Sequence, residues 1–222
     1  MIHTKTYPVL PYNRTEILRY AGARDGTPDI LALLEECLAE LEGKLALRVC
    51  WTEVPLAVQG TSLDMGGITV SSAALATHLA DCGQVILFAA TAGIGLDRLI
   101  ARYSRVSPVK ALLFQAIGAE RIECLCDAFC GEMTAQKATL GQGMTRRFSP
   151  GYGDLPLDLQ RSLFQLLDCP RKIGLTLNES MLMSPSKSVT ALLGISPVPC
   201  TQGQAAGCAV CSQASCAYRR TT

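Results

Sequence analysis

The feature that most constrains the fold is a long helix pattern between Val109 and Cys130. Apolar side chains recur there at the 3.6-residue spacing of an α-helix that packs one face against the rest of a protein. The stripe consists of Val109, Leu112, Leu113, Ala116, Ile117, Ala119, Ile122, Leu125, Cys126 and Phe129. The sequence therefore predicts one packed helix across this whole segment.

Three carboxylates, those of Glu120, Glu123 and Asp127, lie on one face of this predicted helix. Their spacings of three and four residues bring side chains close together along a helix. Spacing alone favours a solvated acidic stripe. A binding role for these carboxylates requires a partner from another segment.

The strongest strand pattern is the segment from Gln84 to Ala90, which is followed by residues 91–95, Thr-Ala-Gly-Ile-Gly, and by a helix from about Leu96. A strand, a glycine-rich turn and a helix resemble half of a dinucleotide-binding fingerprint. However, Arg98 occupies the position of the third glycine. We therefore favour a tight strand-to-helix turn without a nucleotide.

Shorter patterns predict the remaining elements. Helices are expected at residues 13–20, 27–41, 71–79 and 157–167, the first two beginning at the N-cap residues Asn13 and Thr27. Strands are expected at residues 47–51, 68–70, 173–183 and 188–195.

Composition limits the class of protein. The 222 residues, of which 49% are hydrophobic, predict one large domain over residues 1–197 and a cysteine-rich tail over residues 198–222. A formal net charge of +1 gives no basic surface for nucleic acid or for an anionic membrane. The longest apolar run, Val85 to Leu96, is shorter than the roughly 20 residues of a membrane span, and the N-terminus does not resemble a signal peptide. We expect the eleven cysteines to be reduced thiols in a cytoplasmic protein.

The segment from Gly141 to Pro156 is rich in glycine and proline and carries Arg146 and Arg147. Such residues favour a shaped loop over a flexible linker, because Pro150-Gly151 restricts the backbone conformation. This loop supplies the cationic partner that the acidic helix face lacks.

Two motifs resemble a known family. They are Arg147-Phe148-Ser149-Pro150-Gly151-Tyr152 with Pro156, and residues 178–183, Asn-Glu-Ser-Met-Leu-Met, with Pro185 and Ser188-Val189. Together they resemble the activation (reactivation) domain of cobalamin-dependent methionine synthase. Residues 15–20, Thr-Glu-Ile-Leu-Arg-Tyr, are similar to the free-standing form of that domain. The resemblance implies an α+β fold with a twisted antiparallel sheet flanked by helices.

The resemblance also implies a function. Domains of this family bind S-adenosylmethionine (AdoMet) and support reductive methylation of cob(II)alamin held by a partner. The implied partner is a corrinoid-dependent methionine synthase that lacks its own activation domain, with flavodoxin or ferredoxin as the electron donor. Methyl transfer from a sulfonium to cobalt needs no proton transfer, so no acid–base catalytic residue is expected.

Site residues carry over by position in the motif. Arg147 matches the arginine that pairs with the methionyl carboxylate, and a guanidinium suits that role because it forms two parallel hydrogen bonds. Glu123 is the match for the carboxylate that holds the ammonium group, with Glu120 and Asp127 as alternatives. The backbone that meets the adenosine is provided by Ser149, Pro150, Gly151 and Tyr152.

Other interpretations stay open at this point. Arg147 is a surface cation if the motif is accidental, with Arg146 an equal candidate; Gly151-Tyr152 is then an ordinary turn and Glu179 a structural residue. Two other functions are a docking or assembly module for a corrinoid methyltransferase that uses no AdoMet, and an iron–sulfur reductive activator.

The tail contains Cys200, Cys208, Cys211 and Cys216 within a short segment. Four thiolates so close together are typical of one tetrahedral zinc site or one iron–sulfur cluster, and the spacing does not choose between them. The alternative is a reduced tail without metal. The cysteines of the long helix, Cys124, Cys126 and Cys130, are instead expected to fill the core.

Overall fold

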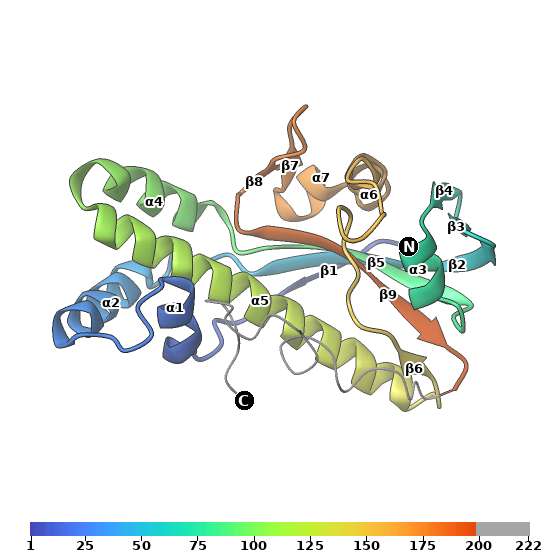
Figure 1. The fold of residues 1–222 in the computed structure, drawn as a ribbon, viewed down its shortest axis with the longest axis horizontal. Coiled ribbons are helices and arrows are strands. Elements are labelled where there is room, and N and C mark those ends of the chain that lie inside the picture. Colours follow the sequence, from blue (N-terminus) through green and yellow to red (C-terminus); the bar gives the residue numbers. More distant parts are fainter. Residues whose placement is uncertain (199–222) are drawn as a thin grey trace.

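A computed structural model describes residues 1–198 of the chain. Their main sheet has seven strands in the order β4-β3-β2-β5-β9-β6, with β1 also pairing with β2, and every pairing is antiparallel (Figure 1). These strands are β1 (His3–Thr6), β2 (Arg48–Gln59), β3 (Ser62–Met65), β4 (Ile68–Ser71), β5 (Gln84–Thr91), β6 (Gly143–Met144) and β9 (Ser188–Ser196). The predicted antiparallel α+β architecture is confirmed.

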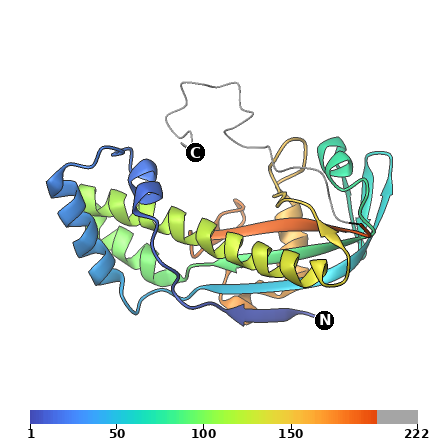
Figure 2. The same ribbon diagram turned by 90° about the horizontal axis from the view of Figure 1, so that it is seen from below.

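The long helix is also confirmed and is longer than its apolar stripe. Helix α5 runs from Pro108 to Ala138 and crosses one face of the sheet (Figures 1 and 2). Beside its N-terminal half lie α1 (Arg14–Tyr20), α2 (Pro28–Leu41) and α4 (Ile94–Val106). The stripe is only partly buried, since Val109 and Leu112 are about half exposed. Across residues 1–198, every helix is too short or too polar to span a bilayer.

The opposite face of the sheet carries α3 (Ala73–His78), α6 (Leu159–Leu167) and α7 (Cys169–Ile173). Strand β5 shows this division, because Ile86 and Phe88 pack in the core beneath α5, whereas Val85 and Leu87 pack in the core beneath α3 and α6. Successive side chains of a strand point to opposite faces. A strand covered on both faces explains why residues 84–90 are almost continuously apolar.

The helix starts predicted at Asn13 and Thr27 are confirmed. The Asn13 side chain accepts a hydrogen bond from the backbone N–H of Glu16, and that of Thr27 accepts one from Ile30. These side chains satisfy N–H groups that have no partner within the first turn. Gly95, in the first turn of α4, has a steric reason, because a Cβ there would overlap the carbonyl oxygen of Lys44.

The strand predicted at residues 173–183 is wrong. This segment contains the end of α7 and a small hairpin of β7 (Thr176–Leu177) and β8 (Met183–Ser184). Gly174 ends α7 in the left-handed conformation at φ +70°. The Asn178 side chain accepts from the backbone N–H of Leu182, and Met181 adopts φ +61°, so the chain reverses between β7 and β8.

Candidate functional site

The carboxylates of α5 are divided between two roles. Glu120 is 4% exposed and is bound by the Arg121 guanidinium and by the backbone N–H of Asn13 at 3.1 Å. Arg121 also donates to the carbonyl oxygens of Leu10 and Pro11. This buried pair holds the segment before α1 against α5, because a buried charge needs a partner and hydrogen bonds. Glu120 is therefore a structural residue and not part of a solvated acidic stripe.

Glu123 and Asp127 instead share Arg147. The Nη2 atom of Arg147 lies 3.0 Å from Oε2 of Glu123 and 2.7 Å from Oδ1 of Asp127. The Arg147 side chain is 24% exposed, against 37% for Glu123 and 62% for Asp127. Burial lowers the pKa of Arg147, but Cys126, Glu123 and Asp127 outweigh it, so the pKa lies above the ordinary value and the guanidinium stays charged.

A cleft of about 370 Å³ opens between α1 and α5, next to this arginine. Its volume lies within the range of small-molecule sites. Glu123 and Asp127 belong to both the cleft wall and the ion pairs of Arg147, and Glu16 adds a further carboxylate. The cleft is lined by Pro11, Asn13, Glu16, Tyr20, Glu120, Glu123, Cys124 and Asp127. Glu16 and Glu120 are paired with Arg19 and Arg121, so the excess negative charge of the cleft comes from Glu123 and Asp127, which share one arginine.

The backbone around Arg147 is fixed to the edge of the sheet. The N–H of Thr145 donates to the carbonyl of Gly194 at 3.0 Å, and Phe148 exchanges two hydrogen bonds with Leu192, at 3.0 and 2.8 Å. Arg147 lies between these two attachments. A side chain on backbone held at both sides is well placed to meet α5.

The loop then forms a tight turn. The N–H of Tyr152 donates to the carbonyl of Ser149 at 3.1 Å, and the N–H of Gly151 donates to the carbonyl of Leu155 at 2.9 Å. Gly151 has φ +87°, a conformation that favours glycine. Pro150 is buried, whereas Tyr152 is 72% exposed and meets the ring of Phe148 edge-on at 6.1 Å. The turn thus presents a free aromatic face.

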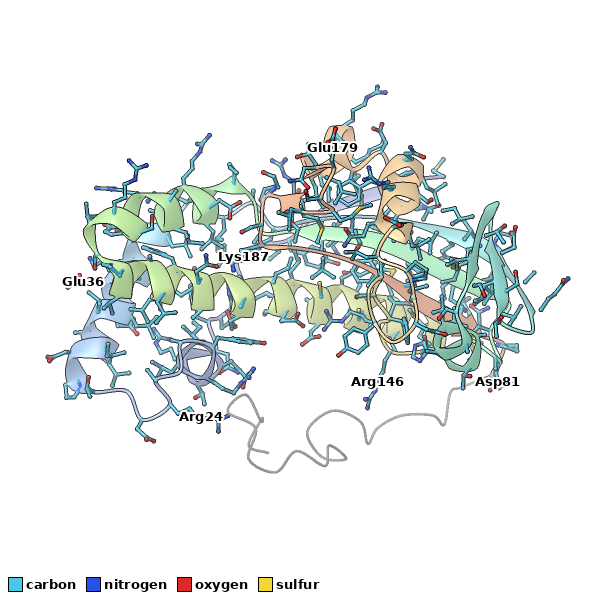
Figure 3. All side chains as sticks on the ribbon, turned by 45° about the horizontal axis from the view of Figure 1, so that its top comes forward. Arg24, Glu36, Asp81, Arg146, Glu179 and Lys187 are labelled. Atoms are coloured by element: carbon cyan, nitrogen blue, oxygen red, sulfur yellow. The ribbon has the colours of Figure 1, made fainter. Side chains whose placement is uncertain are left out.

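The structure places Arg147 beside Glu123, with Ser149 to Tyr152 following on the same loop; their roles in binding AdoMet stay predictions. It does not bring Glu179 to them, because that residue lies in the exposed β7–β8 turn. Figure 3 shows Glu179 near the top of the view, well away from Arg146 at the start of the loop. The sequence reasoning missed that Asp127 is an equal partner of Arg147, although the four-residue spacing from Glu123 was a usable signal.

The predicted metal ligands Cys200, Cys208, Cys211 and Cys216 lie outside the described residues. Within residues 1–198, no group of three or more His, Cys, Asp or Glu side chains is arranged to hold a metal. Cys126 is fully buried, as expected of a core residue. Cys124 and Cys130 are half-buried, and Cys124 lines the acidic cleft.

Comparison with known proteins agrees with the fold and the motif. The family model "Vitamin B12 dependent methionine synthase, activation domain" matches residues 74–199. A solved structure described as the MetH reactivation domain bound to AdoHcy is similar with a TM-score of 0.60, at 14% identity over 87% of this chain and 78% of that one. At that identity the likeness shows the fold. A search of curated proteins finds no match.

Proposed function

We propose that this chain, which belongs to the vitamin B12-dependent methionine synthase activation-domain family by the match of its residues 74–199, binds AdoMet as methyl donor. With this methyl group it supports reductive methylation of cob(II)alamin on a corrinoid-dependent methionine synthase. The chain acts with that partner as the activation component of a methyltransferase.

The observation that carries the proposal is the arrangement of Arg147 between Glu123 and Asp127. The methionyl end of AdoMet is a zwitterion, with one carboxylate and one ammonium group. When it enters, its carboxylate pairs with Arg147 and its ammonium with Glu123, so each protein charge exchanges one partner for another. This exchange leaves no half-buried charge unpaired, and an unpaired charge would cost binding free energy.

The choice among the three carboxylates rests on their present partners. Glu120 is saturated by Arg121 and the Asn13 N–H, which favours Glu123 for the ammonium group. Asp127 is more exposed and keeps Arg147 oriented, since a guanidinium has five N–H donors. The acidic cleft also suits the positive sulfonium of the ligand.

The loop supplies the second half of the proposed site. Gly151 lacks a side chain, which permits close approach of a ribose, and the exposed ring of Tyr152 offers a stacking face. Ser149 and Pro150 shape the turn. The corrinoid of the partner supplies the nucleophile for the methyl group, and this chain contributes position and charge without moving a proton.

The proposed partner is a methionine synthase without its own activation domain, and a flavodoxin or ferredoxin provides the electron. The proposal extends to Cys200, Cys208, Cys211 and Cys216, whose spacing supports one zinc ion or one iron–sulfur cluster. A cluster, unlike zinc, relays an electron.

Titration calorimetry with AdoMet tests the proposal directly. We expect saturable binding, with competition from S-adenosylhomocysteine (AdoHcy). A chain that gives no heat with either ligand, yet binds a cob(II)alamin-loaded methionine synthase, is the docking module without AdoMet, and the proposal is then wrong.

A further inference from the structure

We propose that the short helix α3 is a clamp that holds both ends of the loop from Arg146 to Asp154, with His78 and Asp154 as positioning residues for Arg147. The inference rests on the proposed function, because it concerns the loop that would meet AdoMet. It adds residues that lie outside both family motifs.

The C-terminal end of α3 holds the start of the loop. The Nε2 atom of His78 lies 2.8 Å from the carbonyl oxygen of Arg146. Because a carbonyl only accepts, Nε2 carries the hydrogen in this contact. The His78 ring also packs against the ring of Phe148, with centroids 5.2 Å apart. His78 therefore holds the residues directly before and after Arg147.

The N-terminal end of α3 holds the end of the loop. The Asp154 carboxylate accepts from the Ser72 hydroxyl and from the backbone N–H groups of Ala73 and Ala74, the latter two at 2.7 and 3.1 Å. Acidic groups at a helix N-terminus satisfy unpaired donors there. Gly153 adds close packing, since a Cβ on it would lie 3.1 Å from that of Ala74.

Helix α3 is itself firmly anchored. Leu75 and Leu79 are fully buried in the core that also contains Leu155, Leu163 and Leu192. Leu155 directly follows the loop, and Leu192 is the β9 residue that pairs with Phe148. The clamp, the residue after the loop and the Phe148–Leu192 attachment thus share one core.

This arrangement separates positioning from binding. The Arg147 side chain reaches the carboxylates of α5. On the α3 side, His78 holds the backbone before Arg147 and the ring after it. Loss of the His78 hydrogen bond leaves the Phe148–Leu192 pairing and the core in place. The expected consequence is a looser loop and a weaker AdoMet site in a folded protein.

Two variants separate the two contacts of His78. His78→Phe keeps a ring against Phe148 and removes the donor, whereas His78→Gln keeps an amide donor. The matched control is Thr77→Ala, because among residues 1–198 the exposed Thr77 hydroxyl donates within the helix, to the Ala73 carbonyl.

Hydrogen exchange of residues 146–154 is measured first on ligand-free full-length protein, with AdoMet affinity measured in parallel. For His78→Phe we expect the hydrogen-exchange rate of the loop and the AdoMet dissociation constant each to rise about three- to tenfold, because one hydrogen bond is lost. The thermal midpoint should stay nearly unchanged. Thr77→Ala is expected to match wild type, and His78→Gln to restore at least part of the loss.

Unchanged loop exchange in His78→Phe overturns the clamp. So does faster exchange that leaves AdoMet affinity at the wild-type value. Failure of the proposed function has a different signature: wild type does not bind AdoMet, while the exchange measurement still decides whether His78 holds the loop.

Discussion

Replacement of Arg147 by methionine is the most informative test of the site. Methionine keeps much of the aliphatic length but removes the charge and all five donors. A charge-assisted hydrogen bond contributes about 1.5–3 kcal/mol, so its loss predicts an AdoMet dissociation constant about 10- to 150-fold higher.

The cost to folding should be much smaller. Both ion-pair partners are partly solvated, with Glu123 37% and Asp127 62% exposed. Ion pairs in such settings contribute about 0.2–1 kcal/mol each, so the two together contribute at most about 2 kcal/mol. For a domain of this size, the loss of both pairs lowers the thermal midpoint by at most about 4–8 °C.

The assay pairs calorimetry with thermal unfolding, and Arg146→Met is the matched control. Arg146 is exposed and projects away from the sheet (Figure 3), and its contact with His78 uses the backbone carbonyl, which the substitution keeps. The control should change AdoMet affinity less than about twofold, as is usual for an exposed side chain away from a site. Equal losses from both variants, or a change below twofold for Arg147→Met, would refute the assignment of the carboxylate partner.

Three further predictions test the rest of the site. Glu123→Gln should weaken AdoMet about tenfold but leave its desamino analogue nearly unaffected, whereas Asp127→Asn should weaken both slightly; equal effects of Glu123→Gln on the two ligands would move the ammonium role to Asp127. The pKa of Asp154 lies below its ordinary value, chiefly because the Ser72 hydroxyl donates to it, with a further contribution from the Ala73 N–H. The ionised Asp154 carboxylate therefore contributes its full stabilisation above about pH 4, and this stabilisation is lost as the pH falls through the lowered folded-state pKa. The difference in thermal midpoint between wild type and Asp154→Asn should then vanish in acid, and a difference that stays constant with pH would contradict the cap. Deletion of residues 198–222 should remove bound zinc or iron while AdoMet affinity stays within about twofold, and metal retained by the truncated protein would rule out the four-cysteine site.

The features that sequence predicted well are those fixed by local physics. The period of α5, the doubly covered strand β5 and the caps at Asn13 and Thr27 each depend on residues within one or two turns or along one strand. That Arg147 lies near α5 could be expected for a different reason, because the family motif implies a contact between distant segments that local patterns do not show.

The features that sequence missed depend on contacts between distant segments. The sequence predicts one strand where the structure has the hairpin at residues 176–184, because the turn depends on the Asn178 side chain and on Met181 at positive φ. Glu120 looked like its neighbours on α5, and only the fold brings Arg121 and the Asn13 N–H to it. His78 has no local signal, since its partner is 68 residues away.

The edge of the sheet explains how binding and positioning coexist in one short loop. Gly143 and Met144 pair with Ser196 and Ile195 of β9, and after residues 145–147, which lie outside the strands, Phe148 forms an isolated bridge to Leu192. Around this bridge, Arg147 meets the carboxylates of α5 on one side, while Phe148 packs in the core beneath α3 on the other. A one-residue shift of this segment against β9 would place the phenyl ring toward α5 and the guanidinium in an apolar core. That shift is opposed by the unpaired charge, by the loss of ring packing against His78 and by the attachments of Thr145 and Phe148. The register of this edge therefore keeps Arg147 on the carboxylates of α5.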